Sequence, residues 1–156
     1  MIDNEPVLYI IMRNDMESLN PGKLSAQCGH AVSMFHQKMN SVKANSDLKS
    51  LFLEWLSDRD FGTKIVLGAD KGQIDDICYS LKNKSNIAND IVYDPTYPFW
   101  TTEEIANILI EYNIATHNGN IKNKNHLLTR KELTCMYIFG DKNVISEYVI
   151  HLNLYP

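Results

Sequence analysis

The sequence is poor in cysteine and contains no long apolar run. Its three cysteines, Cys28, Cys78 and Cys135, are odd in number, far apart and each embedded in an apolar helix or strand pattern. This spacing argues against a disulfide framework or a zinc site and predicts buried thiols in a reducing compartment. The five histidines show no paired ligand spacing either, so we expect no metal and no other cofactor.

Targeting signals are also missing from the pattern. The segment before the first predicted strand is short, polar and acidic, and no apolar stretch reaches the length of a membrane span. We therefore expect a cytoplasmic protein with no signal peptide and no membrane contact.

Excess positive charge is absent as well. The formal net charge is −4, which argues against a uniformly basic nucleic-acid binder. The distribution still allows two local basic patches. One would contain Lys23, Lys38, Lys43 and Lys49, and the other Lys122, Lys124, Arg130 and Lys131. The length of 156 residues and ordinary fractions of apolar (44%) and charged (22%) residues predict one folded domain, residues 1–156.

The most informative stretch joins a predicted strand, Val7 to Met12, to a predicted long helix. Asn20 can cap this helix, and Pro21 fits its first position. Lys23, Gln27 and His30 follow at helical spacing, so they share one polar face beside the apolar stripe. The stripe consists of Leu24, Cys28, Ala31, Val32, Phe35 and Met39.

Lys23 is unusual because a cation in the first turn opposes the helix macrodipole, at a cost of about 0.3–1 kcal/mol unless an anion lies nearby. The helix start and Lys23 together therefore indicate an anion site. An ordinary solvated lysine on an amphipathic helix explains the same residues equally well.

Three more strands and four more helices are expected along the chain. Ser46, Asp70 and Thr101 are the predicted caps of the next three helices, the last with Glu104 in a capping box. The strands are predicted over 63–67, 87–93 and 133–139, and the polar segment 117–125 is predicted to be an exposed, mobile loop. The predicted fold is an α/β three-layer sandwich, a mixed four-stranded sheet flanked by helices, with residues 95–132 inserted before the last strand.

Several short motifs occur in a fixed order along the chain. They are 9–13 (YIIMR) with Asp15, Gly22-Lys23, Ala26-Gln27, His30-Ala31, 64–67 (KIVL), Asp94, and 133–135 (LTC) with Gly140. In this order the sequence resembles the type II peptidyl-tRNA hydrolases, over residues 7–39, 63–94 and 133–154. The resemblance implies a mixed four-stranded sheet and hydrolysis of the ester between a peptide and the terminal ribose of tRNA, which recycles tRNA from aborted translation.

The same resemblance implies a set of site residues. The catalytic residues would be Lys23, Asp94, Thr134 and His30, whereas Gly22, Gln27 and Thr96 would bind substrate. The reaction needs an activated water and a donor for the developing oxyanion; Lys23 suits the second task and Asp94 would orient Lys23 or the water. His30 could transfer a proton, but a hydrogen-bonded structural histidine is the favoured alternative, and Gln27 is expected to support the site.

One segment departs from the family. The aspartate of the family continues into a small glycine-containing turn with a threonine, whereas here 94–100 reads DPTYPFW. Thr96 could replace the missing threonine. Asp94 could equally be a strand-end turn residue, and Thr134 could be present for its strand propensity alone.

The insertion suggests further contacts with tRNA. Lys122, Lys124, Arg130 and Lys131 could follow the phosphate backbone, and Tyr97, Phe99 and Trp100 could stack on bases of the acceptor end. The alternatives are a solvated charge run and aromatic residues that fill the core. The apolar face of the inserted helix could also contact a second copy in a homodimer.

Two other functions fit the same sequence. The altered turn after Asp94 favours a catalytically inactive tRNA- or protein-binding member of the fold. A hydrolase of a different ester is the third hypothesis, because fold does not fix function.

Overall fold

The computed structural model describes residues 5–41 and 45–156, so Lys43 of the first predicted basic patch lies outside the described residues. The chain divides into two compact units, each described by itself. Unit one comprises Met1–Val92 and Thr134–Pro156, and unit two comprises Tyr93–Leu133. Unit two covers the range 95–132 that the sequence marks as an insertion.

The sheet is mixed, as predicted, but it has six strands instead of four. The order is β3-β5-β1-β2-β6, with β4 pairing with β5; β1 is parallel to β2 and antiparallel to β5. The prediction missed strand β4. The sixth strand is the two-residue β6, which lies in the predicted short extended piece 152–154 and pairs with Leu67 and Gly68. The bounds are β1 Pro6–Arg13, β2 Lys64–Ala69, β3 Ala88–Thr102, β4 Thr116–Lys122, β5 Asn125–Asp141 and β6 Asn153–Leu154.

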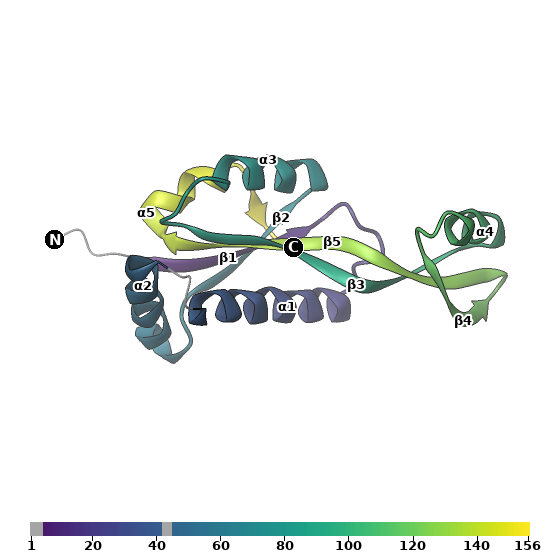
Figure 1. The fold of residues 1–156 in the computed structure, drawn as a ribbon, viewed down its shortest axis with the longest axis horizontal. Helices are drawn as coiled ribbons and strands as arrows, with labels where there is room; N and C mark the ends of the chain where they lie inside the picture. The colour runs from purple at the N-terminus through teal and green to yellow at the C-terminus, as the bar shows by residue number, and fades with distance from the viewer. Residues whose placement is uncertain (1–4, 42–44) are drawn as a thin grey trace. The chain divides into compact units, whose positions relative to one another are not determined.

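Helices cover both faces of the unit-one sheet, which gives the predicted three layers. Helix α1 lies along one face and α3 along the other (Figure 1). Short 3-10 turns follow α2 and α5. The bounds are α1 Pro21–Asn40, α2 Ser46–Ser57, α3 Lys71–Leu81 and α5 Lys142–Ile145, with 3-10 turns Asp58–Asp60 and Ser146–Tyr148.

Local capping chemistry explains where these helices begin. The Asn20 side chain accepts a hydrogen bond from the Lys23 N–H at 3.0 Å, and Asp70 forms a complete capping box with Gln73, so both predicted caps are confirmed. The Ser46 prediction is wrong by one residue, because Asn45 accepts the Asp47 N–H at 2.8 Å.

An aromatic cluster joins α1 and α2 to the sheet. The Phe35 ring makes edge contacts with Phe52 and Trp55 and a tilted contact with Phe139. The Trp55 indole N–H donates to the Thr63 carbonyl oxygen at 2.8 Å, which satisfies the one polar atom of this buried ring. Gly62 passes so close, with φ +70°, that a Cβ there would lie 2.2 Å from Trp55. The cluster fixes the packing that holds α1 against the sheet.

The Tyr137 hydroxyl gives a stability prediction. The residue is 0% exposed, and within the described part of the chain its hydroxyl has no hydrogen-bond partner. A buried hydroxyl without a partner costs about 1–3 kcal/mol. Tyr137→Phe is therefore expected to raise the free energy of unfolding by about 1 kcal/mol, measured by urea denaturation. Tyr79→Phe is the control because Tyr79 is 80% exposed; a clear loss of stability in Tyr137→Phe would contradict the prediction.

Unit two is a helix packed on a β-hairpin. Helix α4, Glu103–Glu111, contacts a small core of Ala106, Ala115 and Leu128, joined by Phe99 and Leu109. The cap is Thr102, whose hydroxyl accepts the Ile105 N–H at 3.5 Å, so the predicted Thr101 capping box is wrong. The expected apolar face is largely exposed, with Ile105 at 48% and Tyr112 at 70%.

Two further predictions in this segment are corrected. The expected loop at 117–125 is the hairpin of β4 and β5, with Asn123 and Lys124 at its turn, both at positive φ. Two central residues at positive φ are the geometry of a type I′ hairpin turn. Strand β3 does not end at Asp94 but continues to Thr102; it lies at one end of the strand order, where proline is tolerated because no ladder bond is lost.

Candidate active site

The start of α1 is electropositive in this structure. The helix has no acidic residue in its first turn, so nothing on the helix itself offsets its dipole. The Asn20 side chain accepts a hydrogen bond from the Lys23 N–H, and the Asn20 carbonyl oxygen accepts one from the Leu24 N–H. Pro21 has no N–H. Within the described residues the Gly22 N–H has no acceptor, and a Cβ at Gly22 would meet only Asn20 Oδ1, at 3.5 Å. The Lys23 side chain is half-buried beside this end of the helix.

Gln27 and Thr134 form a buried pair beneath this helix start. Of the three residues predicted to share a polar face, Gln27 is buried: it is 2% exposed, and Thr134 is 0% exposed. The Thr134 hydroxyl donates to Gln27 Oε1 at 2.7 Å, and its oxygen lies 3.4 Å from the Val92 carbonyl oxygen. A hydroxyl has one proton to donate, so the shorter contact to Gln27 is the hydrogen bond. The pair joins the second turn of α1 to β5 and so sets the position of the helix start that carries Lys23.

The cysteines close to this pair in the sequence, Cys28 and Cys135, are not activated as nucleophiles. Cys135 is buried with its Sγ 3.7 Å from the Gln27 carbonyl oxygen, and burial raises the pKa of its thiol to about 12. Burial also raises the pKa of Cys28. A thiolate nucleophile is therefore disfavoured here near neutral pH. All three cysteines are free, but Cys28 and Cys78 are only half-buried, where the sequence predicted full burial.

His30 lies on the exposed side of α1, two turns after Lys23. In the part of the chain that the structure describes, no hydrogen bond holds its ring. The favoured alternative, a packed and hydrogen-bonded structural histidine, is therefore wrong. The imidazole is accessible to solvent and to a bound molecule.

Asp94 and Thr96 belong to unit two. Asp94 Oδ1 accepts the Thr96 N–H at 2.9 Å, so the two residues form an Asx turn around Pro95. Asp94 is half-buried and Thr96 is exposed. The alternative role is therefore confirmed only for the turn contact, which uses one carboxylate oxygen. Asp94 is not at a strand end, because β3 continues to Thr102.

The four basic residues of unit two fall into two pairs. Arg130 forms an ion pair with Glu132 at 2.7 Å, and its guanidinium lies 4.6 Å from the Phe99 ring centre; Lys131 lies 4.7 Å from the Tyr93 ring centre. Lys122 and Lys124 are exposed at the hairpin turn, and among the described residues neither has an ion pair. The structure therefore leaves the turn lysines as the available cations.

The aromatic residues considered for base stacking are also divided. Tyr97 is 1% exposed, Phe99 packs against the core of unit two, and Trp100 is 48% exposed. Core filling, the alternative, therefore explains Tyr97 and Phe99. Trp100 alone of the three offers a ring face to a ligand.

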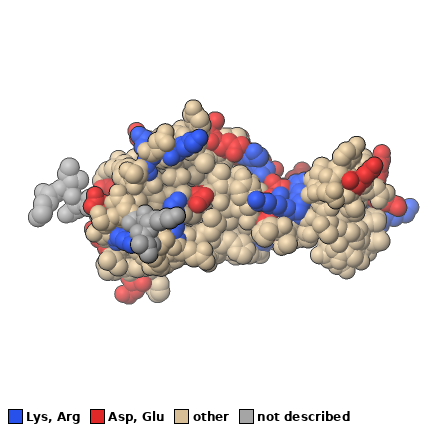
Figure 2. Space-filling view, in the orientation of Figure 1, with Lys and Arg blue, Asp and Glu red and all other residues tan. Residues whose placement is uncertain are grey.

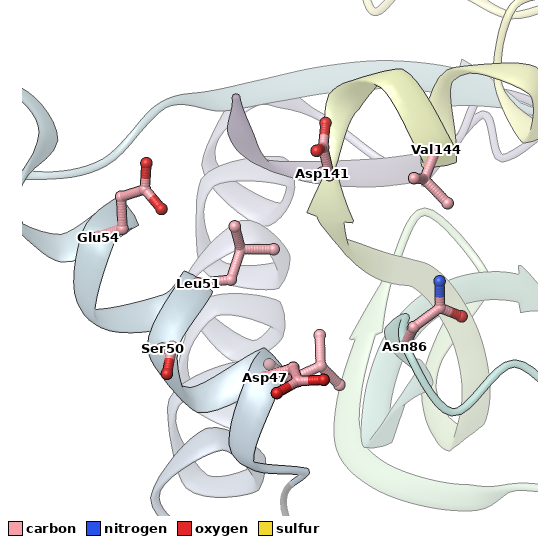
Figure 3. Close-up of a pocket in the computed structure, with 8 residues that line it drawn as sticks. Asp47, Ser50, Leu51, Glu54, Asn86, Asp141 and Val144 are labelled. Atoms are coloured by element: carbon pink, nitrogen blue, oxygen red, sulfur yellow. The ribbon is translucent and has the colours of Figure 1, made fainter. Parts of the chain in front are cut away.

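A cavity of about 330 Å³ lies elsewhere in unit one (Figure 3). Asp47, Glu54 and Asp141 line it, and no described lining residue is basic. Asp141 pairs with Pro6 at the start of β1, whereas Cys135, next to Thr134, pairs with Met12 near its end, roughly 20 Å away at 3.3 Å per residue. A cavity lined by carboxylates repels a phosphate backbone, so this cavity is separate from the candidate site and unsuited to RNA.

Charge of both signs is present on the face of the molecule shown in Figure 2. On the face shown in Figure 2, basic and acidic side chains are interspersed. This agrees with the expectation that the protein is not uniformly basic. Within the described residues, no group of three or more histidine, cysteine or carboxylate side chains could hold a metal. No helix of the described chain has both the length and the apolar character to cross a membrane.

Arg13 and Asp15 brace the loop that leads from β1 into α1. Arg13 is 8% exposed, and its Nε and Nη2 donate to the two Asp15 oxygens at 2.5 and 2.9 Å. The Lys71 N–H also approaches Asp15 Oδ2, at 3.4 Å. The hydrogen bond from Arg13 is the main reason that the pKa of Asp15 lies below its ordinary value of 3.8.

This pair predicts a specific acid sensitivity. A lowered folded-state pKa means that the ionised Asp15 contributes its full stability above 3.8 and loses it as the pH falls below that value. Asp15→Asn should therefore lower stability near neutral pH and flatten the fall in free energy of unfolding between about pH 5 and about pH 3. Asp75→Asn, which removes an exposed carboxylate paired with Lys71, is the control. Parallel curves for Asp15→Asn and the parent protein would contradict the assignment.

Comparison with known proteins gives one finding. The family model described as peptidyl-tRNA hydrolase PTH2 matches residues 6–155, whereas no curated protein matches the chain. The match covers nearly the whole length, including the helix start at Lys23, the buried Gln27–Thr134 pair and the turn at Asp94. The chain belongs to the PTH2 family of peptidyl-tRNA hydrolases.

Proposed function

We propose that this protein hydrolyses the ester bond between peptide and tRNA in peptidyl-tRNA and so recycles tRNA from aborted translation. The observation that carries the proposal is the family match over residues 6–155. The electropositive start of α1, held by the buried Gln27–Thr134 pair, supports it because ester hydrolysis passes through an oxyanion. The substrate partner is tRNA, the setting is the cytoplasm, and no cofactor takes part.

The reaction adds water to the ester carbonyl carbon and breaks the bond from that carbon to the ribose oxygen. The carbonyl oxygen becomes negatively charged, the water loses a proton, and the ribose oxygen gains one. Lys23 supplies a cation for the oxyanion or for a phosphate, and the Gly22 N–H adds a donor at the same helix end. Asp94 orients the attacking water, and His30, exposed on α1, transfers a proton.

Gln27 and Thr134 have a different role in this proposal. Both are buried, and Thr134 already donates its proton to Gln27. They act as positioning residues that keep α1 in register with β5. Thr96, exposed in the Asx turn, and the basic residues Lys122, Lys124, Arg130 and Lys131 serve substrate binding.

The test is hydrolysis of labelled peptidyl-tRNA by the purified protein in the presence of a chelator. We expect release of free peptide and intact tRNA. Retention of tRNA binding without release would favour the catalytically inactive RNA-binding alternative. A small acyl ester run in parallel separates the third hypothesis, because hydrolysis of that ester alone would indicate another substrate class.

The apolar side of α4 supports one structural proposal. Ile105 and Ile108 are each about half-exposed, and we infer that this face suits a homodimer contact. Sedimentation at several concentrations tests it, because a monomer at all concentrations would contradict the homodimer.

A further inference from the structure

The segment 112–131, here called the basic hairpin, carries charge of one sign. It contains four Lys or Arg residues and no Asp or Glu, in a chain whose formal net charge is −4. All seven residues of β4 are exposed, so this strand contributes little to a core. A two-stranded ribbon whose charged side chains are all basic and whose β4 strand is exposed suits a polyanionic ligand.

Two histidines lock this ribbon across its strands. The Gly119 N–H donates to His117 Nδ1 at 2.7 Å, and His117 Nε2 lies 2.9 Å from His126 Nδ1. Because His117 Nδ1 accepts a hydrogen bond, the neutral ring carries its proton on Nε2 and donates it to His126. His126 then carries its own proton on Nε2. The neutral pair therefore uses both accepting nitrogens inside the hairpin and leaves one N–H, that of His126, for a ligand.

An added proton has no vacant nitrogen in this network. It must displace either the bond from Gly119 or the bond between the rings, and two imidazolium ions at this separation repel each other. Unit two also carries titratable groups on the hairpin and on the helix packed against it. They are Lys122 and Lys124 at the turn, Tyr112 directly after α4, and the α4 residues Glu103, Glu104 and Glu111; among the described residues none forms an ion pair with either imidazole. A phosphate bound at the hairpin would stabilise an added positive charge on the pair by pairing with it.

We propose that the basic hairpin binds the RNA phosphate backbone through Lys122 and Lys124, and that the His117–His126 pair takes up a proton when a phosphate binds. This proposal rests on tRNA as the substrate in the proposed function. It assigns the two histidines a role that the hydrolytic reaction does not require. It also separates the turn lysines from Arg130 and Lys131, which the Phe99 and Tyr93 rings and Glu132 already engage.

The first arm of the test measures binding of deacylated tRNA against salt concentration. Lys122→Gln with Lys124→Gln is expected to weaken binding several-fold and to reduce the slope of log K against log salt by about 1–2. Lys82→Gln with Lys84→Gln is the matched control, since these lysines are also exposed and two residues apart. A slope equal to that of the parent protein would overturn the hairpin as the binding element.

The second arm measures proton uptake on tRNA binding, by calorimetry near pH 6.5 in two buffers of different ionisation enthalpy. The parent protein should take up a proton and bind several-fold more tightly at pH 6 than at pH 8. His117→Gln with His126→Gln should lose both effects, whereas His151→Gln, an exposed histidine of unit one, should keep them. Undiminished uptake in the double variant would overturn the role of the pair.

Hydrolysis assays on the same variants keep the two proposals distinguishable. Peptide release by the parent protein with unaltered tRNA binding in the hairpin variants would leave the proposed hydrolysis of peptidyl-tRNA standing and overturn this inference. If tRNA binding depends on the hairpin but the protein releases no peptide, this inference stands and the proposed hydrolysis is overturned.

Discussion

Replacing Lys23 by alanine is expected to lower kcat for peptidyl-tRNA hydrolysis by at least about 100-fold while leaving the fold intact, as is typical for loss of a positioned electrostatic group. The side chain is half-buried at the start of a helix whose first turn carries no acidic residue. The helix gains nothing from a cation there. Its removal should therefore reduce the rate without lowering the melting temperature.

Steady-state kinetics can separate two roles of Lys23. A cation that stabilises the oxyanion acts in the transition state, so its loss lowers kcat; a cation that only holds a phosphate raises KM instead. Lys23→Arg should recover part of the rate because it keeps the charge. Lys38→Ala is the control, because it removes one positive charge from the last turn of the same helix, where Lys38 bonds to the Asn89 carbonyl oxygen. A near-normal kcat in Lys23→Ala would remove this residue from the mechanism.

The features that could be predicted from sequence are those fixed by neighbouring residues. Asn20 and Asp70 cap their helices with groups three residues away, so the caps are visible in a short window. The buried strand β1 is equally readable because it is a continuous apolar run. The α/β class follows from the order of such segments.

The features that were missed depend on residues far apart in the chain. The spacing placed Gln27 on a polar helix face, but it could not show that a partner 107 residues later satisfies its side chain in the core. Strand β4 has no apolar alternation, since all of its side chains are exposed, and it is ordered by pairing with β5. His117 and His126 meet only because the hairpin brings positions nine residues apart together.

Asp94 is the proposed site residue for which turn geometry and chemistry compete most directly. Proline at position 95 suggests a strand end, yet β3 continues as an edge strand and Asp94 accepts the Thr96 N–H within it. A carboxylate and an amide oxygen can both accept this bond. Only the carboxylate carries the negative charge that would orient or activate water.

Comparing Asp94→Asn with Asp94→Ala therefore decides between the two roles. If the charge takes part in hydrolysis, both variants should lower kcat by about 100-fold or more, even though asparagine keeps an acceptor for the Thr96 N–H. The melting temperature and tRNA affinity of Asp94→Asn should stay near those of the parent protein, because the turn is preserved. Full activity in Asp94→Asn with loss only in Asp94→Ala would show that Asp94 serves the backbone of β3. The DPTYPFW segment would then mark a member of the family whose catalytic charge lies elsewhere, because a shaped turn by itself supplies no base.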